Sequence, residues 1–466
     1  MKTFERIMKD EILKRTSHFL DTRQHGFLSG KSCTTNLLGF CDTLAVSLNN
    51  CHITDVIYFD FAKAFDSVNH DILLHKLKYK YEIDGRLLKF LKNYLSGREQ
   101  GVVIGNTQSS KKAVLSGVPQ GSILGPILFV LFINDISDGL TPGTDLALYA
   151  DDTKIWRTIY SEHDQVVLQN DVRYLHEWSL RNKIKFHPNK CKVLSVANNT
   201  PPLLGILPNI QFIYFLGENP LDYTESEIDL GVNINPKLNF NTHCNRIVSK
   251  ANQMLGLTKR TCHFVNNSNR RRALYLALVR SQFEHCSVIW RPTGKTLLQK
   301  FENLQKRAIK WILFEEGIRY NTLSTYIQKC RQVDLLPISS RFELTELIIF
   351  HKILYELYPV KLPSYLSFYN GNSRLRSSHF DRLTVISSIH PKSSSYTVTN
   401  MSSRSALGNT FFYRTHLKWN NLPFDIRNTS DPSKFKDALI KQLWCDISTN
   451  LVSCAGSEEE DLLDTG

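Results

Sequence analysis

Three aspartates stand where carboxylates can do chemistry. Asp60 closes an apolar run, and Asp151 and Asp152 stand side by side in "LALYADDTKIW". Adjacent like charges between apolar segments are unfavourable, because burial and repulsion both penalise the charged form. A divalent cation would offset this cost, and oxygen-only ligands suit Mg²⁺ or Mn²⁺. Two such ions about 3.5–4 Å apart serve in-line phosphoryl transfer, whereas the simpler alternatives are a hairpin turn and a turn residue after a strand.

The hydrophobic pattern predicts the elements that would bring these acids together. Val56 to Phe59 form a continuous apolar run, typical of a strand buried on both faces. The segment around Asp151 reads as a tight hairpin with its acids at the turn. The order strand–helix–helix–strand–strand–helix–strand predicts an α+β layer with helices on one face of an antiparallel sheet. A mostly helical unit is expected to follow.

Composition sets the broad class of the protein. The chain has 466 residues, 42% of them hydrophobic, which allows several packed units. It has no uncharged apolar run of about 18 residues and no signal-peptide pattern, so we expect no membrane span and an intracellular protein of the nucleus or cytoplasm. The ten cysteines are scattered without a C-x-x-C pair. This spacing argues against a zinc module, a secreted fold and a disulfide-linked partner.

The charge is strongly basic. The formal net charge is +13, and the last ten residues, "SEEEDLLDTG", hold five acids and no base, so the rest of the chain carries +18. This excess is typical of proteins that bind a polyanion such as nucleic acid. A basic, solvated surface without such a partner is the alternative.

Six motifs in order carry a family resemblance. "LYADD" resembles the catalytic box of reverse transcriptases, and "YFDFAKAFDSVNHDIL" resembles the first metal-binding motif of non-LTR retrotransposon enzymes. "SGVPQGSILGPILFVLFINDI" resembles their dNTP and template motif, and "QHGFLSGKSCTTNLL" their fingers motif. "HPNKCKVLSV" and "IDLGVNINPKLNF" resemble the two motifs after the catalytic box. The later segments "LVRSQFEHCSVIW", "LQKRAIKWI" and "WNNLPFDI" resemble the region after the polymerase in jockey-like elements.

The resemblance implies a right-hand polymerase with a ferredoxin-like palm. Such an enzyme is an RNA-directed DNA polymerase, which extends a DNA primer on an RNA template with dNTPs and two Mg²⁺ ions, or Mn²⁺. The expected divisions are partial fingers at 1–55, a palm with an inserted fingers segment at 56–240, a basic helical thumb at 241–320, and a region of unknown role with an acidic tail at 321–466. The reverse transcriptase domain would cover about residues 1–235.

The resemblance assigns the chemistry to five positions. Asp60 and Asp151 match the metal ligands, and Asp152 matches the second acid of the pair. The backbone carbonyl of Phe61 would complete a metal shell. Lys190 matches the lysine that protonates the leaving pyrophosphate as a general acid; without the family it is one surface lysine among many.

Five further positions match substrate and primer contacts. Phe65 matches the aromatic gate that excludes a ribose 2′-hydroxyl, although a core aromatic is the simpler interpretation. Gln120 and Gly121 match residues along the incoming base and sugar, where glycine permits close approach; a plain turn is the alternative. Leu230 and Gly231 match the primer grip.

Three consecutive arginines are candidates for a thumb contact, and parts of the family's motif pattern are absent. Arg270, Arg271 and Arg272 would contact phosphates without sequence preference, or form a solvated helix face. No upstream fingers motif with its triphosphate-binding arginine is present, nor the endonuclease domain, so we expect an N-terminally truncated chain. Leu28 stands where many relatives carry arginine, and Lys31 is a candidate for local charge. The alternatives are a catalytically impaired nucleic-acid-binding remnant and an RNA-synthesising polymerase, the latter disfavoured by the aromatic gate.

Overall fold

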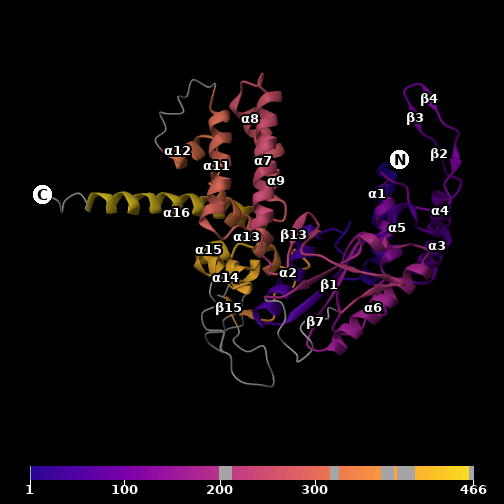
Figure 1. Cartoon of the computed structure of the whole chain (residues 1–466). Helices are drawn as coiled ribbons and strands as arrows, with labels where there is room; N and C mark the ends of the chain where they lie inside the picture. The colour runs from indigo at the N-terminus through magenta and orange to yellow at the C-terminus, as the bar shows by residue number, and fades with distance from the viewer. Residues whose placement is uncertain (1, 199–211, 315–324, 369–382, 386–404, 461–466) are drawn as a thin grey trace. The chain divides into compact units, whose positions relative to one another are not determined.

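The chain divides into two compact units (Figure 1). The computed structural model describes residues 2–198, 212–314, 325–368, 383–385 and 405–460. The first unit comprises Met1–Leu230 and Ile234–Leu238, and the second comprises Gly231–Asn233 and Asn239–Gly466.

A five-stranded sheet of order β11-β8-β1-β7-β6 forms the centre of the first unit. Its strands are β1 (Ile53–Phe59), β6 (Asp145–Tyr149), β7 (Asp152–Ile159), β8 (Lys192–Val196) and β11 (Asp222–Tyr223). Neighbours run antiparallel, except that β11 pairs parallel with β8. Helices connect β1 to β6 and β7 to β8, which gives the β-α-β-β-α-β arrangement of ferredoxin-like folds. The predicted α+β class with a ferredoxin-like sheet is confirmed.

Helices and short hairpins complete the first unit. The helices are α1 (Lys2–Thr16), α2 (Cys33–Asn49), α3 (His70–Tyr79), α4 (Gly85–Leu95), α5 (Leu124–Ile133) and α6 (Glu162–Arg181). The short strands are β2 (Glu99–Gln100), β3 (Val103–Ile104), β4 (Thr107–Gln108), β5 (Lys112–Ala113), β9 (Phe215–Leu216), β10 (Asn219–Pro220) and β12 (Glu227–Asp229), and β12 pairs with β13 (Val232–Ile234).

Helices lie on both faces of the sheet. Ile57 and Phe59 of β1 join the main core, to which α5 and α6 also contribute. Val56 lies on the opposite face, because strand side chains alternate; on that face Phe40 of α2 packs edge-on against Trp156, with 4.9 Å between ring centroids. The strand is buried on both faces, as predicted. The expectation that helices cover only one face is wrong, because an apolar second face also has to be covered.

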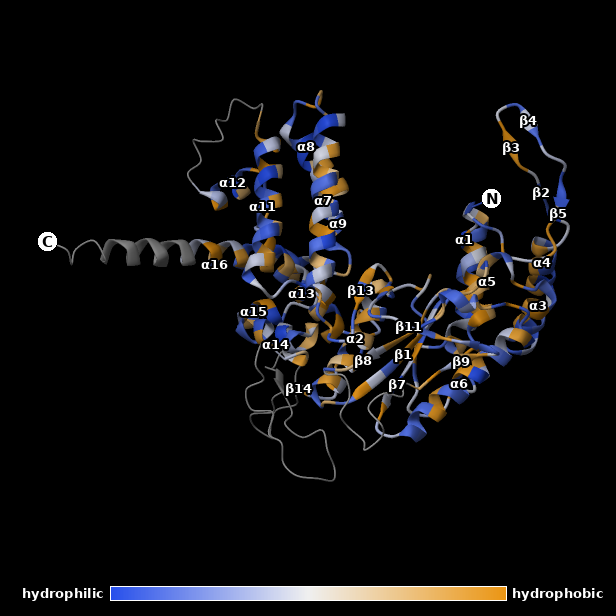
Figure 2. Cartoon of the chain, in the orientation of Figure 1, coloured by the Kyte–Doolittle hydropathy of each residue, from blue (hydrophilic) through white to orange (hydrophobic). Residues whose placement is uncertain are grey.

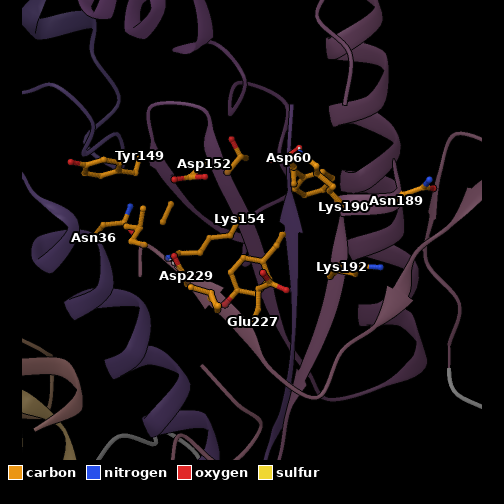
Figure 3. Close-up of a pocket in the computed structure, with 16 residues that line it drawn as sticks. Asn36, Asp60, Tyr149, Asp152, Lys154, Asn189, Lys190, Lys192, Glu227 and Asp229 are labelled. Carbon is orange, nitrogen blue, oxygen red and sulfur yellow. Dashed lines mark hydrogen bonds and ion pairs between the residues drawn. The ribbon is translucent and has the colours of Figure 1, made fainter. Parts of the chain in front are cut away.

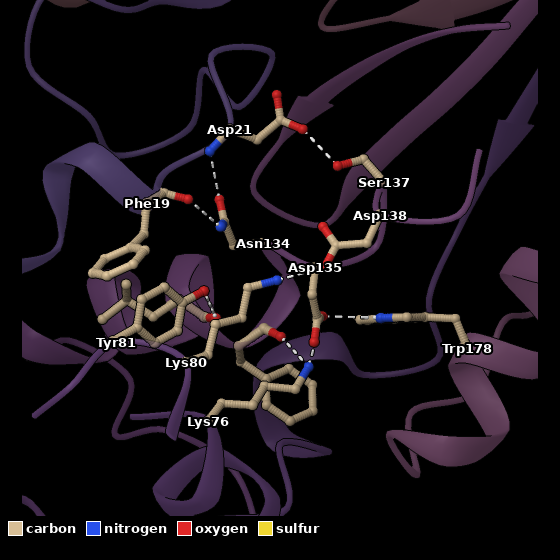
Figure 4. A network of polar contacts seen from close by, with 12 residues as sticks. Phe19, Asp21, Lys76, Lys80, Tyr81, Asn134, Asp135, Ser137, Asp138 and Trp178 are labelled. Atoms are coloured by element: carbon tan, nitrogen blue, oxygen red, sulfur yellow. Dashed lines mark hydrogen bonds and ion pairs between the residues drawn. The ribbon is translucent and has the colours of Figure 1, made fainter. Parts of the chain in front are cut away.

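A buried polar network joins three helices on the main-core side (Figure 4). Helix α5 is apolar along its whole length (Figure 2), and Asp135 follows it. Asp135 accepts hydrogen bonds from Lys76 Nζ of α3 at 2.7 Å and Trp178 Nε1 of α6 at 2.9 Å. Asn134 Oδ1 accepts from the backbone N–H of Asp21 at 2.8 Å. Because buried polar groups are costly unless paired, this network fixes the helices and anchors the segment between α1 and α2.

The second unit is mostly helical, as predicted. Its helices are α7 (Asn241–Thr261), α8 (Ser268–Leu274), α9 (Ser281–Glu284), α10 (Ser287–Trp290), α11 (Lys295–Ile312), α12 (Tyr326–Gln332), α13 (Ile338–Leu354), α14 (Phe411–Asn421), α15 (Phe424–Arg427) and α16 (Pro432–Glu460). A π-helical segment, Tyr275–Arg280, links α8 to α9, and β14 (Leu366–Phe368) pairs with β15 (Leu383–Val385). The end of the acidic tail, residues 461–466, lies outside the described residues.

Two expectations from composition can be compared with the structure. None of the helices in the described ranges is long and apolar enough to cross a membrane. The nine cysteines from Cys33 to Cys445 are free thiols.

Candidate active site

The three aspartates lie at one end of the central sheet. Asp151 lies in the two-residue turn between β6 and β7, and Asp152 is the first residue of β7. On the other side, β1 pairs with β7 as far as Phe59 and Thr153. Asp60 follows Phe59 and Asp152 precedes Thr153, so both acids lie at the next position of this antiparallel pairing, at the same end of the sheet. Strand pairing therefore brings together carboxylates that lie some ninety residues apart in the chain.

A cavity of about 420 Å³ opens beside these acids (Figure 3). The charged side chains that line it are Asp60, Asp152, Lys154, Lys190, Lys192, Glu227 and Asp229. Acids and lysines therefore share one concave site, which is typical of pockets that bind a charged ligand through a few convergent polar groups.

The three aspartates at the strand ends are not easily ionised together, because a negative charge on one raises the pKa of another. Burial raises the pKa of Asp151, and the nearby Asp60 carboxylate raises it further. Burial also raises the pKa of Asp152, to about 6; Asp151 and Asp229 add to the increase, and Lys154 opposes it. Like charges at close range penalise the ionised form of each other. The three acids are thus short of positive charge, and a bound cation would stabilise their ionised forms.

Lys190 supplies part of that positive charge. Its Nζ lies 3.2 Å from Asp60 Oδ2, an oxygen that is buried and accepts no hydrogen bond from the described residues. The 3₁₀ turn Pro188–Lys190 just before β8 carries the lysine. The ion pair is half exposed, so water screens it.

The backbone carbonyl of Phe61 takes no part in the hydrogen bonds that join this segment to the segment around Phe186. Its ring stacks on Phe186, with 4.4 Å between centroids, and the two residues form an isolated antiparallel bridge. The hydrogen bonds of this bridge use the carbonyl of Asp60 and the N–H of Ala62. The Phe61 carbonyl lies outside this pair of bonds, at the position where the resemblance expects a metal ligand.

The donor set suits a hard divalent cation, although it is not assembled into a cluster. In the part of the chain that the structure describes, no group of three or more His, Cys, Asp or Glu side chains is spaced to hold a metal ion. Three carboxylates and a carbonyl are nevertheless the ligands that Mg²⁺ and Mn²⁺ prefer. The buried Asp60 Oδ2 is an oxygen that a cation would satisfy.

The loops that carry Phe65 and Gln120 contact each other. The Phe65 ring stacks on Phe129 of α5 with 4.4 Å between centroids, and Phe27 meets it edge-on at 6.0 Å. Gln120 Nε2 donates to Asp66 Oδ1 at 2.8 Å. Two aromatic neighbours restrict the Phe65 ring, so its position is defined by packing.

Three predicted contact residues occupy left-handed backbone positions. The φ angles are 75° at Gly121, 46° at Leu230 and 86° at Gly231. Glycine adopts such angles freely, whereas a branched residue such as Leu230 does so rarely. Leu230 and Gly231 form the turn between β12 and β13.

The "QHG" segment lies against the hairpin that carries Asp151, a contact that sequence reasoning missed. Gln24 bridges in parallel with Leu148 of β6. Its side chain is fully buried, and its Oε1 accepts the N–H groups of Ala150 at 3.0 Å and Gly26 at 2.7 Å. A Cβ added at Gly26 would lie 2.3 Å from the Ala150 nitrogen. The segment therefore fixes the turn that carries the first acid of the pair.

Replacing Gly26 by Ala is expected to lower stability by about 1–3 kcal/mol, because backbone atoms would have to move to admit the methyl group. Gly39→Ala is the matched control, since a Cβ there meets nothing within 4 Å. Gly39 lies inside α2, so alanine should stabilise the protein by about 0.5–1 kcal/mol. Urea unfolding of both variants measures the two effects. If they shift the midpoint in the same direction, the close contact does not constrain the hairpin.

A buried ion pair was also missed. Lys154 of β7 bonds Asp229 of β12, and both side chains are almost fully buried. The available signal was a lysine directly before the apolar residues Ile155 and Trp156 of a predicted strand, because lysine is rarely buried unless it is paired. Its partner follows 75 residues later and could not be identified from spacing.

The structure separates the three consecutive arginines. Arg271 is buried, and its Nη1 donates to the Trp311 carbonyl at 2.9 Å. Arg272 forms an ion pair with Asp334 at 2.8 Å, and Arg270 is exposed. The expectation that all three face solvent as a phosphate-binding group does not match this arrangement, because one guanidinium is used inside the helical unit.

Comparisons with known proteins agree with the motifs. A family model described as "Reverse transcriptase (RNA-dependent DNA polymerase)" matches residues 1–258. The chain is 24% identical over 334 residues to the "Probable RNA-directed DNA polymerase from transposon X-element" of Drosophila melanogaster, covering 69% of this chain and 35% of that protein. It is 24% identical over 327 residues to the "RNA-directed DNA polymerase from mobile element jockey" of Drosophila funebris, covering 67% and 34%. The chain spans about a third of the length of these curated relatives.

Among solved structures, the apo telomerase of Candida tropicalis superposes with a TM-score of 0.41 and 10% identity, over 72% of this chain and 56% of that one. The resemblance to non-LTR retrotransposon enzymes, predicted from six motifs, is confirmed by the two transposon relatives. Since the family model covers more than half of its residues, the chain belongs to the reverse transcriptase family.

Proposed function

We propose that this chain is an RNA-directed DNA polymerase, which transfers nucleotides from dNTPs to the 3′-hydroxyl of a DNA primer on an RNA template. The observation that carries the proposal is the meeting of Asp60, Asp151 and Asp152 at adjacent strand ends in a chain of the reverse transcriptase family. Three carboxylates that oppose the ionisation of one another are what a divalent-metal site requires.

In this proposal Asp60, Asp151, Asp152 and the Phe61 carbonyl hold two Mg²⁺ ions, which Mn²⁺ could replace. The ions would activate the attacking hydroxyl and stabilise the leaving pyrophosphate. Lys190, at 3.2 Å from Asp60 Oδ2, is close enough to this site to give a proton to the leaving group.

Other residues orient the substrates. Phe65, fixed by its two aromatic neighbours, would exclude a 2′-hydroxyl and so select dNTPs over NTPs. Gln120 and Gly121 would lie along the incoming nucleotide, and the turn at Leu230 and Gly231 would hold the primer end. Exposed Arg270 remains the proposed phosphate contact of its group.

The proposed divisions follow the same scheme. Residues 1–55 would be partial fingers, 56–240 the palm with an inserted fingers segment, and 241–320 a thumb. Residues 321–466 would form a separate C-terminal region. Two features of the residues after 241 support a thumb. They form helices, and α7 and α11 carry many lysines and arginines.

Primer extension tests the proposal. The purified chain should extend a labelled DNA primer annealed to an RNA template when Mg²⁺ and dNTPs are supplied. Excess EDTA should stop the reaction, and added Mg²⁺ should restore it. Preferential incorporation of NTPs would instead identify an RNA-synthesising polymerase, and no extension with either substrate would refute polymerase activity.

A nucleic-acid-binding remnant is the second candidate, and Lys31 favours it. Its Nζ donates at 2.7 Å to the carbonyls of both Thr22 and Gln24, and burial lowers its pKa. Its ammonium group thus holds this loop and is engaged by the two carbonyls, so Lys31 is a poor candidate for binding the triphosphate. Filter binding of a primer–template duplex without extension would select this candidate.

A further inference from the structure

Aromatic side chains lie beside the ion pair between Lys154 and Asp229. Their side chains are 5% and 6% exposed. Lys154 Nζ lies 4.2 Å from the centre of the Phe40 ring, and Tyr58 of β1 is its cross-strand neighbour. Burial raises the pKa of the Tyr58 phenol well above its usual value, and the Asp229 carboxylate adds to this. Tyr58 is therefore neutral, and the lysine and aspartate compensate one another.

The pair joins two parts of the candidate site. Lys154 lies two residues after Asp152 and on the same face of β7, since strand side chains alternate. Asp229 ends β12 and directly precedes the turn at Leu230. All four residues line the same cavity (Figure 3). A shift of β12 along β7 would change the distance between this turn and the acids.

Stability alone does not account for a charged pair at this place. Removing two charges from water costs about as much as their attraction returns, and well-packed apolar side chains of similar volume often do as well or better. An ion pair differs from an apolar contact in being directional. It holds the end of β12 at one place over the face of β7, with which β12 shares no strand pairing, whereas an apolar pair would tolerate sliding.

We infer that Lys154 and Asp229 are positioning residues, which set the turn at Leu230, and with it the primer 3′ end, at a fixed place relative to Asp152. The inference rests on the proposed function, in which this turn grips the primer. Neither residue has to touch substrate for this role. It predicts that removing the pair changes the placement of the primer end more than the affinity for the duplex.

The test replaces the pair by apolar residues in the full chain, as the double variant Lys154→Met/Asp229→Leu. A single variant would leave an unpaired buried charge and lose stability for that reason alone. The control is Lys80→Gln/Asp138→Asn, which removes an ion pair of 2.6 Å between α3 and the loop after α5. Thermal unfolding confirms that all proteins are folded before they are compared.

The main measurement is the fluorescence of 2-aminopurine placed as the 3′-terminal nucleotide of a DNA primer on an RNA template, with saturating protein and no dNTP. We expect the wild type and the control pair to give the same signal and the apolar double variant a different one. Duplex affinity should change by about twofold or less, while the kcat of single-nucleotide addition falls about tenfold.

The outcomes separate the inference from the proposed function. An identical terminal-nucleotide signal in the folded apolar variant would overturn the inference, whatever the activity. A wild type that adds no nucleotide would refute the proposed function, and the fluorescence comparison would still decide whether the pair sets the primer end. Loss of duplex affinity equal to the loss of rate would also overturn it, because the pair would then act on binding.

Discussion

Replacing Asp151 by Asn should reduce the rate of primer extension about a thousandfold or more, because metal-ion stabilisation of the phosphoryl transfer depends on the ligand charge. Asparagine keeps the volume of the side chain, so the hairpin turn can persist. Burial and Asp60 raise the pKa of Asp151 in the folded protein. An ionised Asp151 is therefore unfavourable for folding at neutral pH, and the neutral amide should leave stability unchanged or slightly higher.

Asp145→Asn is the matched control for this experiment. Asp145 begins β6 at the opposite end of the same hairpin, and burial raises its pKa too, against the attraction of Arg23. Single-turnover extension measures the rate, and urea unfolding measures stability. A wild-type rate in Asp151→Asn would contradict the assignment. An equal loss of rate in both variants would show that any disturbance of the hairpin slows the reaction.

The strands of the site could be predicted because their signals are local. The continuous apolar run before Asp60 and the apolar segments around Asp151 each specify a buried strand by composition. Once both strands are central to one sheet, their polar ends meet. The pairing register sets Phe59 opposite Thr153, so Asp60 comes directly after this pair. The register follows from which side chains of each strand have to be buried.

The supports of the site could not be predicted, because each joins residues with no local signal of a partner. Gln24 and Ala150 are 126 residues apart, and Lys154 and Asp229 are 75 apart. Arg271 stands between two other arginines, and nothing in the local sequence distinguishes it from the exposed Arg270. Only the packing of its helix turns the guanidinium inward, toward the Trp311 carbonyl at the end of α11. Such contacts depend on the tertiary fold, and the sequence restricts them only through residue type.

A second large effect is expected in the helical unit, at Glu346. This residue of α13 is almost completely buried and accepts hydrogen bonds from Arg414 Nε at 2.6 Å and Lys418 Nζ at 2.9 Å, and from Arg291. Burial alone would raise its pKa, but the charges of Arg414, Arg291 and Lys418 hold the pKa at about 2. Three cations therefore converge on this one buried carboxylate.

Glu346→Gln should destabilise this unit by about 3–5 kcal/mol, because the change leaves buried cations without their counter-charge. Glu343→Gln is the control, since this residue lies on the same helix, 33% exposed, with an oxygen 3.7 Å from the same Lys418. An exposed pair of this kind contributes about 0–1 kcal/mol. Urea unfolding followed by helical circular dichroism compares the two variants.

The pH dependence gives this prediction a second, independent measurement. The folded pKa of Glu346, about 2, lies below the ordinary value of 4.5. Ionised Glu346 therefore contributes its full stabilisation above about pH 4.5, and this contribution is lost progressively as the pH falls toward 2. The difference in stability between the wild type and Glu346→Gln should narrow over this range, because both proteins then carry a neutral side chain at the site. A difference that stays constant from pH 5 to pH 2 would mean that the effect of the substitution comes from packing and not from charge.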